Sequence, residues 1–222
     1  MKAVIFDLDG TLLDRESSIY HFALNQYARF YPYVEHIGQE QFVSRFIELD
    51  NKGLVWKDRV YQQLITEYQI TGLTSEQLLN DYIEYFCKSC VPFDYLYQML
   101  KELLAMNVKL GMITNGKEKL QQSSVNALGL GDYFSKVFIS EKEGVKKPNP
   151  IIFRRALQSL QVEPFEAFYV GDHPKNDIQA AQSVGMKTIW KKVEGEKCEN
   201  ANHVVDSLSE IPSIVRAYEY SS

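Results

Sequence analysis

The sequence predicts an α/β fold in which a doubly wound parallel sheet carries an all-helical insert. Short apolar segments alternate with helical patterns in residues 1–14 and 92–222, and such alternation is typical of a parallel sheet with helices on both faces. Residues 15–91 interrupt it, because they contain only amphipathic helical patterns. A chain of 222 residues with 45% hydrophobic residues also has enough apolar surface to bury a core. We therefore predict an α/β core from residues 1–14 and 92–222 and a helical domain from residues 15–91.

The first predicted strand is the largely apolar run at residues 2–8, which the turn-forming pair Asp9-Gly10 ends. The later predicted strands are similarly short and apolar; they cover residues 108–113, 136–140, 167–170 and 187–190. The predicted helices of the core cover residues 93–106, 117–129, 150–161 and 175–184. A last helix is expected from Ser207, its predicted N-cap, to about Tyr218.

The helical domain is predicted to be a bundle that follows the first strand. Its four amphipathic segments lie near residues 16–31, 39–51, 55–69 and 75–87. It holds 14 of the 28 aromatic residues of the chain, and rings at helical spacing usually pack inside a bundle. We expect this of Phe42, Phe46, Trp56, Tyr61 and Tyr68. The candidate basic residues for contact with a substrate are Arg15, Arg45, Lys52, Lys57 and Arg59.

The composition excludes several classes of protein. The net charge of −5 argues against a protein that binds nucleic acid polymers through a basic surface. No apolar run approaches the roughly 18–20 residues that span a membrane, and the amino end lacks the features of a signal peptide. Cys87 and Cys90 match the C-x-x-C spacing, but no second Cys or His pair follows at zinc-ligand spacing. We therefore predict a cytoplasmic protein with reduced cysteines and without a membrane or nucleic acid polymer as partner.

The residues that follow the predicted strands are polar or charged. They are Asp7-Leu8-Asp9-Gly10-Thr11 at the end of the first strand, Thr114-Asn115-Gly116 after the second, Lys146-Lys147-Pro148-Asn149-Pro150 past the third, and Gly171-Asp172-His173-Pro174-Lys175-Asn176-Asp177 after the fourth. In an open parallel sheet the carboxyl ends of the strands face one crevice, where ligands bind. Four carboxylates are therefore expected to converge with a hydroxyl and an ammonium group.

Carboxylates at such close quarters repel each other unless they share protons or bind a cation. Oxygen ligands on loops suit Mg²⁺, which often combines one or two carboxylates with a substrate phosphate. The hydroxyl of Thr114, a lysine ammonium and the backbone N–H groups of Asn115 and Gly116 would contact an anionic substrate. These residues predict metal-assisted phosphoryl transfer through an aspartate nucleophile.

The order of these motifs resembles that of the haloacid dehalogenase-like (HAD) hydrolases, in the subclass whose helical cap is inserted after the first motif. Asp7-Leu8-Asp9-Gly10-Thr11 looks like the first motif, Thr114 the second, Lys147 the third, and Gly171-Asp172 with Asp177 the fourth. The resemblance covers the whole chain and implies a Rossmann-like core, with residues 15–91 as the cap domain.

The resemblance also implies roles for individual residues. Asp7 would attack phosphorus and become an aspartyl-phosphate, and Asp9 would protonate the leaving oxygen and then deprotonate the hydrolytic water. The implied phosphate-binding residues are Thr114, Asn115, Gly116 and Lys147, and the implied Mg²⁺ ligands are Asp7, Asp9 through its main-chain carbonyl, Asp172 and Asp177. The lysine of the family usually directly precedes the proline, which favours Lys147 over Lys146.

The expected activity is that of a Mg²⁺-dependent phosphatase that acts on a small phosphate ester, with a closing cap, in a monomer or homodimer. Asp9 disfavours a dehalogenase, because those members carry a non-acidic residue in its place. Two alternatives stay open: a phosphomutase of sugar phosphates, which would keep both aspartates, and a non-catalytic binding protein of the same fold. His173 is expected to shape its loop, because Pro174 follows it.

Overall fold

The computed structural model describes residues 1–218 and divides the chain into two compact units. One unit joins Met1–Asp14 to the part of the chain that starts at Pro92, and the other is Arg15–Val91. We call them the α/β unit and the helical unit. No helix among the described residues is both long and apolar enough to cross a membrane.

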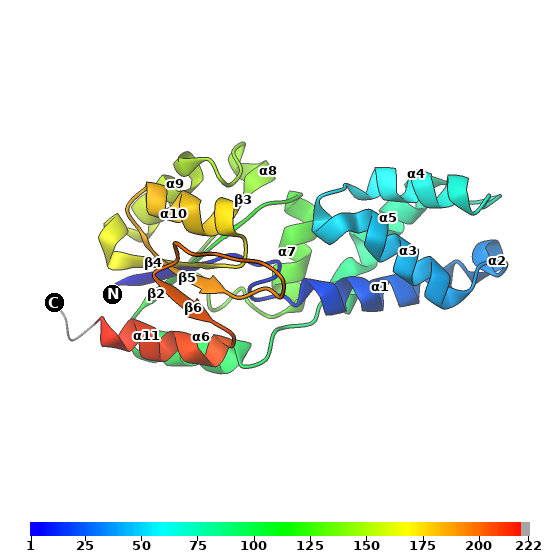
Figure 1. The fold of residues 1–222 in the computed structure, drawn as a ribbon. Helices are drawn as coiled ribbons and strands as arrows, with labels where there is room; N and C mark the ends of the chain where they lie inside the picture. Colours follow the sequence, from blue (N-terminus) through cyan, green and yellow to red (C-terminus); the bar gives the residue numbers. More distant parts are fainter. Residues whose placement is uncertain (219–222) are drawn as a thin grey trace. The chain divides into compact units, whose positions relative to one another are not determined.

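The α/β unit is built on a parallel sheet, as the sequence predicts (Figure 1). Its strands are β1 (Ala3–Phe6), β2 (Lys109–Thr114), β3 (Lys136–Ile139), β4 (Ala167–Gly171), β5 (Lys187–Lys191) and β6 (His203–Val205). They lie in the order β3-β2-β1-β4-β5-β6. The central strand β1 pairs with β2 on one side and β4 on the other, and all four of its residues are fully buried. Burial on both faces explains its uninterrupted apolar sequence.

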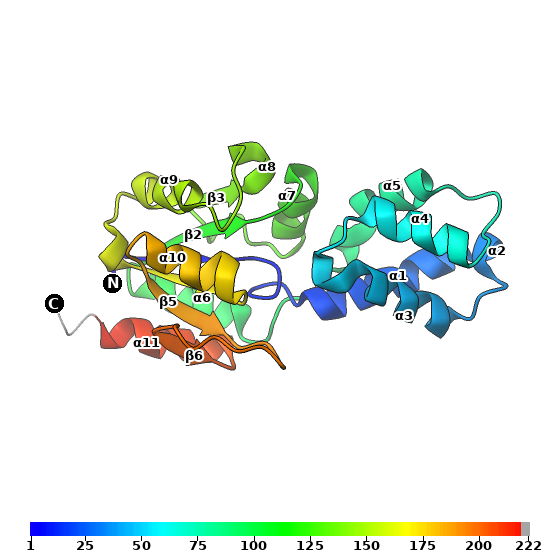
Figure 2. The same cartoon turned by 45° about the horizontal axis from the view of Figure 1, so that its top comes forward.

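Helices cover both faces of this sheet. They are α6 (Leu96–Ala105), α7 (Glu118–Ala127), α8 (Ser140–Glu143), α9 (Pro150–Leu160), α10 (Ala180–Ser183) and α11 (Ile211–Ala217). Helices α9 and α10 lie on one face, and α6 and α11 lie on the other (Figures 1 and 2). Helix α9 begins at Pro150 because the side chain of Asn149 accepts a hydrogen bond from the Ile151 N–H. Its buried face, which includes Phe153, packs against β2 and β3.

Two parts of the α/β unit differ from the sequence prediction. The expected helix at residues 175–184 is present but irregular, because it begins as a π-helix, η4 (Pro174–Gln179), and continues as the short α10. Strand β6 was not predicted, because it has only three residues and Val204 at its centre is half exposed. Ser207 does act as an N-cap, but it caps the short 3₁₀ helix η5 (Leu208–Glu210) that precedes α11.

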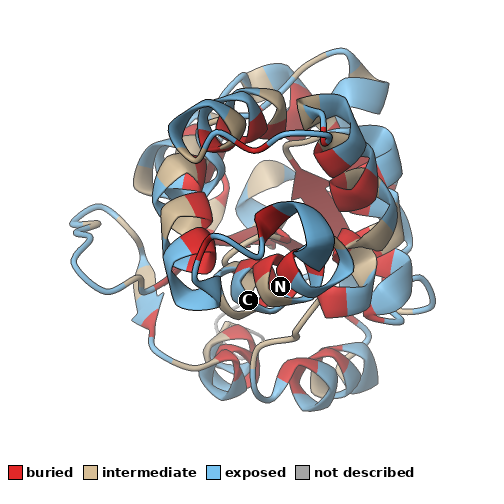
Figure 3. Cartoon of the chain, turned by 90° about the vertical axis from the view of Figure 1, so that its right-hand side faces the viewer, coloured by how far each residue is buried: buried red, intermediate tan, exposed pale blue. Residues whose placement is uncertain are grey.

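The helical unit contains α1 (Arg15–Arg29), α2 (Tyr31–Val34), α3 (Gln39–Asp50), α4 (Lys57–Glu67) and α5 (Ser75–Tyr85). These helices have buried residues on one side and exposed residues on the other (Figure 3). Phe46 stacks on Tyr61 at 5.5 Å between ring centroids, and both rings are fully buried with Phe42. Of the five rings expected to pack, these three are buried, Tyr68 is partly buried, and Trp56 is 36% exposed.

Several candidate basic residues of the helical unit form ion pairs within it. Lys57 is buried against the carboxylate of Asp50, and Arg15 Nη1 lies 2.8 Å from the other oxygen of that carboxylate. Arg45 pairs with two glutamates of its own unit. Arg59, in contrast, is exposed.

Candidate active site

The site lies at the carboxyl ends of two neighbouring strands. Asp7 directly follows β1, and Asp172 directly follows β4. These strands are paired in register, with Phe6 opposite Val170. The chain runs from β1 to β2 and β3 on one side of the sheet and to β4 on the other, so the strand order reverses here. Ligands of open α/β sheets bind at such a reversal, outside the carboxyl ends of the strands.

Three carboxylates meet at this point. Asp7, Asp172 and Asp177 each offer one oxygen, and these oxygens lie within 4.8 Å of one another. Burial, together with the neighbouring acids, raises the pKa of Asp7 well above its usual 3.8, although Lys147 acts in the opposite direction. Burial and the charge of Asp177 likewise raise the pKa of Asp172 to about 7. Ionisation of these carboxyl groups is therefore unfavourable without a further cation, and three hard oxygen donors at this spacing fit a divalent metal ion.

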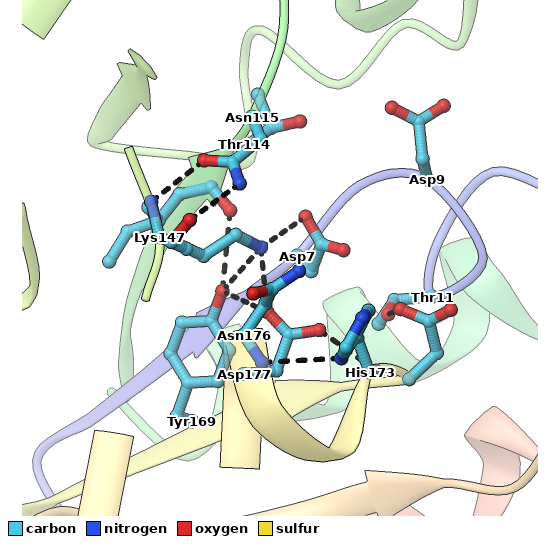
Figure 4. Close-up of polar contacts among 12 residues, drawn as sticks. Asp7, Asp9, Thr11, Thr114, Asn115, Lys147, Tyr169, His173, Asn176 and Asp177 are labelled. Carbon is cyan, nitrogen blue, oxygen red and sulfur yellow. Dashed lines mark hydrogen bonds and ion pairs between the residues drawn. The ribbon is translucent and has the colours of Figure 1, made fainter. Parts of the chain in front are cut away.

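Lys147 supplies the positive charge of the site. Its Nζ lies 2.7 Å from Asp7 Oδ1 and 2.7 Å from Asp177 Oδ1, and it donates a hydrogen bond to the hydroxyl of Tyr169 at 3.0 Å (Figure 4). Burial alone would lower its pKa, but the two carboxylates raise that pKa well above 10.5. Lys147 is 3% exposed and remains an ammonium, whereas Lys146 is exposed.

The loop that carries Lys147 is attached to the end of β2 by Asn115. The amide Nδ2 of Asn115 donates to the Lys147 carbonyl at 3.0 Å, and the Lys147 N–H donates to Asn115 Oδ1 at 2.9 Å. The Asn115 side chain is therefore engaged with the backbone of Lys147. The group of Asn115 that we expect to bind phosphate is its backbone N–H, not this side chain.

The turn η4 positions Asp177. Its carboxylate accepts hydrogen bonds from the backbone N–H of His173 at 3.0 Å and from the hydroxyl of Tyr169 at 3.2 Å. His173 Nδ1 accepts from the backbone N–H groups of Lys175 and Asn176, each at 3.2 Å. His173 therefore caps the turn, which is the loop-shaping role expected from the sequence.

Gly10 of the first motif lies so close to the carboxylate of Asp172 that no side chain fits at its position. Gly10 has a φ of +82°, and a Cβ at this position would lie 2.4 Å from Asp172 Oδ2. A side chain would therefore displace a carboxylate of the cluster. The first and fourth motifs meet at this contact.

Asp9 lies outside the carboxylate cluster. In Figure 4 its carboxylate points away from Asp7 and Lys147. Asp9 Oδ2 accepts a hydrogen bond of 2.7 Å from Nε2 of Gln121, a residue of α7. The same Nε2 donates to Thr114 Oγ1 at 2.6 Å, and Thr114 is fully buried at the end of β2.

The sequence of the chain matches the family described as "Haloacid dehalogenase-like hydrolase" over residues 4–191. The chain belongs to this family. The match includes β1 apart from its first residue, all of β2 to β5, and every residue of the site described above.

Several curated relatives of this HAD hydrolase are named as phosphatases. The chain is 30% identical to the phosphoserine phosphatase of Thermus thermophilus over 86% of this chain and 88% of the relative. It is 41% identical to the glyceraldehyde 3-phosphate phosphatase of Pyrococcus furiosus, and that match spans about half of each protein, 47% of this chain and 46% of the relative. The solved structure of a HAD phosphatase from Thermococcus onnurineus is 29% identical, with a TM-score of 0.69 over 97% of this chain and 98% of that chain.

Two polar residues of this HAD hydrolase site were not among the sequence candidates. Gln121 occupies a buried position of α7 between Leu120 and Ser124, and a polar residue on the apolar side of a helix is a signal that the sequence did contain. Tyr169 lies between Phe168 and Val170 in a strand that is buried on both faces, so no pattern distinguishes its hydroxyl from an ordinary core ring.

Proposed function

We propose that this HAD hydrolase is a Mg²⁺-dependent phosphatase that hydrolyses a small phosphate monoester through an aspartyl-phosphate on Asp7. The observation that carries this proposal is the buried contact of Lys147 with Asp7 and Asp177 at the reversal of the strand order. A cation beside a carboxylate nucleophile provides a place for a phosphoryl group, whose charge it offsets during transfer.

The reaction would proceed in two balanced steps. In the first, a carboxylate oxygen of Asp7 bonds to phosphorus, the bond from phosphorus to the ester oxygen breaks, and Asp9 gives its proton to that oxygen. In the second, Asp9 takes a proton from water, the water oxygen bonds to phosphorus, and the bond to Asp7 breaks to release phosphate. One group would thus act as acid and then as base. In-line displacement places the leaving oxygen opposite Asp7, so the acid that protonates this oxygen has to lie apart from Asp7. Asp9 lies apart from Asp7 in Figure 4.

The remaining residues would bind the phosphoryl group and the metal ion. We assign the phosphoryl oxygens to Lys147, to the hydroxyl of Thr114 and to the backbone N–H of Asn115. The backbone N–H of Gly116, which the sequence also favoured, instead donates a hydrogen bond to Ser140 Oγ at 2.9 Å. The proposed ligands of Mg²⁺ are Asp7, Asp172 and Asp177, with the main-chain carbonyl of Asp9. When bound there, the ion would act as a Lewis acid toward the phosphoryl oxygens.

The names of the relatives support small phosphate esters as the substrate class, because phosphoserine and glyceraldehyde 3-phosphate both carry a phosphate on a short chain. The division of the chain at Asp14 and Pro92 supports our assignment of residues 15–91 as the cap of the family. Cap closure that excludes water would protect the aspartyl-phosphate until the second step.

The test measures phosphate release from p-nitrophenyl phosphate and from a panel of small phosphate esters, with Mg²⁺ and with EDTA. We expect release that requires Mg²⁺ and that Asp7→Asn abolishes. Asp132→Asn, the same substitution at an exposed residue of the α/β unit, is the matched control and should retain full activity. Full activity of Asp7→Asn would refute the nucleophile, and full activity in EDTA would refute the metal requirement. Isomerised sugar phosphate without free phosphate would indicate a mutase instead.

A further inference from the structure

Gln121 connects two groups to which the proposed reaction gives different tasks. Its Nε2 lies 2.7 Å from Asp9 Oδ2, 2.6 Å from Thr114 Oγ1 and 3.1 Å from the carbonyl oxygen of Asn115. An amide nitrogen has two N–H groups, so three acceptors share two protons. One side chain therefore holds the proposed acid, the proposed phosphate ligand and the loop after β2 together.

The side chain of Gln121 is fixed in place by its surroundings. It is 3% exposed, and its backbone N–H donates to the carbonyl of Lys117 at 3.0 Å. It also passes directly over Gly116, where an added Cβ would lie 2.8 Å from Gln121 Cγ. The glycine of the Thr114-Asn115-Gly116 motif thus makes room for Gln121, while its backbone N–H donates to Ser140 Oγ at 2.9 Å.

The direction of these hydrogen bonds has a chemical consequence. An amide nitrogen can only donate, so Thr114 Oγ1 and Asp9 Oδ2 are both acceptors in their contacts with Gln121. The hydroxyl proton of Thr114 is therefore not used in this contact and can be donated to a phosphoryl oxygen. The carboxyl group of Asp9 is held by the same amide nitrogen as Thr114 and lies outside the carboxylate cluster. In-line transfer likewise requires the acid to lie apart from the nucleophile.

We propose that Gln121 is a positioning residue that holds Asp9 at the leaving oxygen and orients Thr114 toward the phosphoryl group. This inference rests on the proposed phosphatase function. Gln121 itself does not touch the reacting atoms; it acts through Asp9 and Thr114. The effect of removing its N–H groups should therefore depend on how strongly the leaving oxygen needs a proton.

The test compares two classes of ester in Gln121→Met, which keeps an unbranched side chain of similar length but has no donor. An alkyl phosphate needs protonation of its leaving oxygen, whereas 2,4-dinitrophenyl phosphate does not. We expect kcat/KM for the alkyl ester to fall by about 100-fold, because correct placement of a general acid contributes roughly 10²–10⁴-fold. For the aryl ester we expect a fall of about tenfold, from weaker phosphoryl binding by Thr114. The alkyl-to-aryl ratio should thus fall about tenfold.

Two further variants separate positioning from a merely structural role. Gln122→Met alters the neighbouring exposed glutamine, whose Nε2 donates to Asn126 in its own helix, and should leave both rates unchanged. In an Asp9→Asn background, Gln121→Met should change the alkyl-to-aryl ratio little further, because both substitutions remove the same proton transfer. If Gln121→Met does not fold, Gln121→Leu also removes the donors and adds no charge beside Asp9.

Each outcome decides the proposal. An equal fall of kcat/KM for both esters in Gln121→Met would overturn the positioning role, and so would a further fall of the alkyl-to-aryl ratio in the Asp9→Asn background. In either case phosphate release by the wild-type protein would still support the phosphatase. Wild-type protein that releases no phosphate from any ester would instead overturn the proposed function, and the role of Gln121 with it.

Discussion

The ammonium group of Lys147 lies 2.7 Å from Oδ1 of Asp7, although 140 residues separate them in the chain. The contact is buried, and Asp177 lies at the same distance from the same nitrogen. Water screens such charges little, so the three groups form one electrostatic unit in which each depends on the others. In the proposed reaction, the same ammonium would offset the charge of the phosphoryl group.

Loss of this ammonium is expected to affect both stability and activity. In Lys147→Ala, the carboxylates of Asp7 and Asp177 would face each other without compensation, so the free energy of unfolding should fall by about 3–5 kcal/mol. Phosphate release should fall by at least about 10³-fold. Lys146→Ala is the control at an exposed position, with an expected change within about 0.5 kcal/mol. Urea denaturation and phosphate release measure both effects, and a larger loss in Lys146→Ala would reverse the assignment.

The pKa of Asp172 predicts how pH affects the metal-free protein. This pKa is about 7 in the folded chain, against the usual 3.8 of an aspartate in an unfolded chain. Between these values the folded chain keeps a proton that the unfolded chain has lost, so the Asp172 contribution to the free energy of unfolding falls as pH rises from about 4 to about 7. Melting temperatures in EDTA, compared with those of Asp172→Asn, isolate this contribution. A wild-type protein that gains stability relative to the variant over this range would contradict the prediction.

Mg²⁺ should reverse this loss, because it requires the ionised carboxylate. We expect the rise in melting temperature on adding Mg²⁺ to be larger at about pH 8 than at about pH 5. Asp172→Asn should show a smaller rise at either pH. A rise that is equal at both pH values in the wild-type protein would argue that Asp172 is not a ligand.

The two proposed roles of Asp9 can be separated by following the phosphorylated protein. In Asp9→Asn, an aryl phosphate with a good leaving group should still phosphorylate Asp7, but hydrolysis of the aspartyl-phosphate should slow by about 10²–10⁴-fold. The phosphorylated protein should then accumulate and be detected by mass spectrometry after acid quenching. Asp7→Asn should show no adduct under the same conditions, and an adduct at another residue would refute the nucleophile.

The buried ion cluster of the helical unit gives a prediction that does not involve catalysis. Asp50 lies between Lys57 and Arg15; burial alone would raise its pKa, but these cations lower it below 3.8. Asp50→Asn should reduce the free energy of unfolding by about 3–5 kcal/mol, because Lys57 would stay buried without its counter-charge. Glu48→Gln, which removes an exposed partner of Arg45, should cost about 0–1 kcal/mol. Equal losses of unfolding free energy in Asp50→Asn and Glu48→Gln, measured by urea denaturation, would show that the cluster contributes little to stability.

Several elements of the fold could be predicted because their signals are local. The apolar run of β1 and the alternation of later strands with helices predicted a parallel sheet, which the strand pairing confirms. Strand β6 has too few residues for such a signal, and it exists because its backbone pairs with β5. The expected helix at residues 175–184 is present, but its first part is the π-helix η4, which carries the contact of Asp177 with the His173 N–H. That contact depends on the tertiary arrangement.

The sequence by itself determined the fold class and the polar residues at the strand ends, because hydrophobic periodicity and turn residues act over a few positions. The tertiary structure alone decided which of these groups touch. It buried Lys147 rather than Lys146 between two carboxylates, and it placed Gln121 against Asp9 across 112 positions of the chain. Contacts of this kind follow from the order of the strands and the packing of α7, which no local pattern of residues encodes.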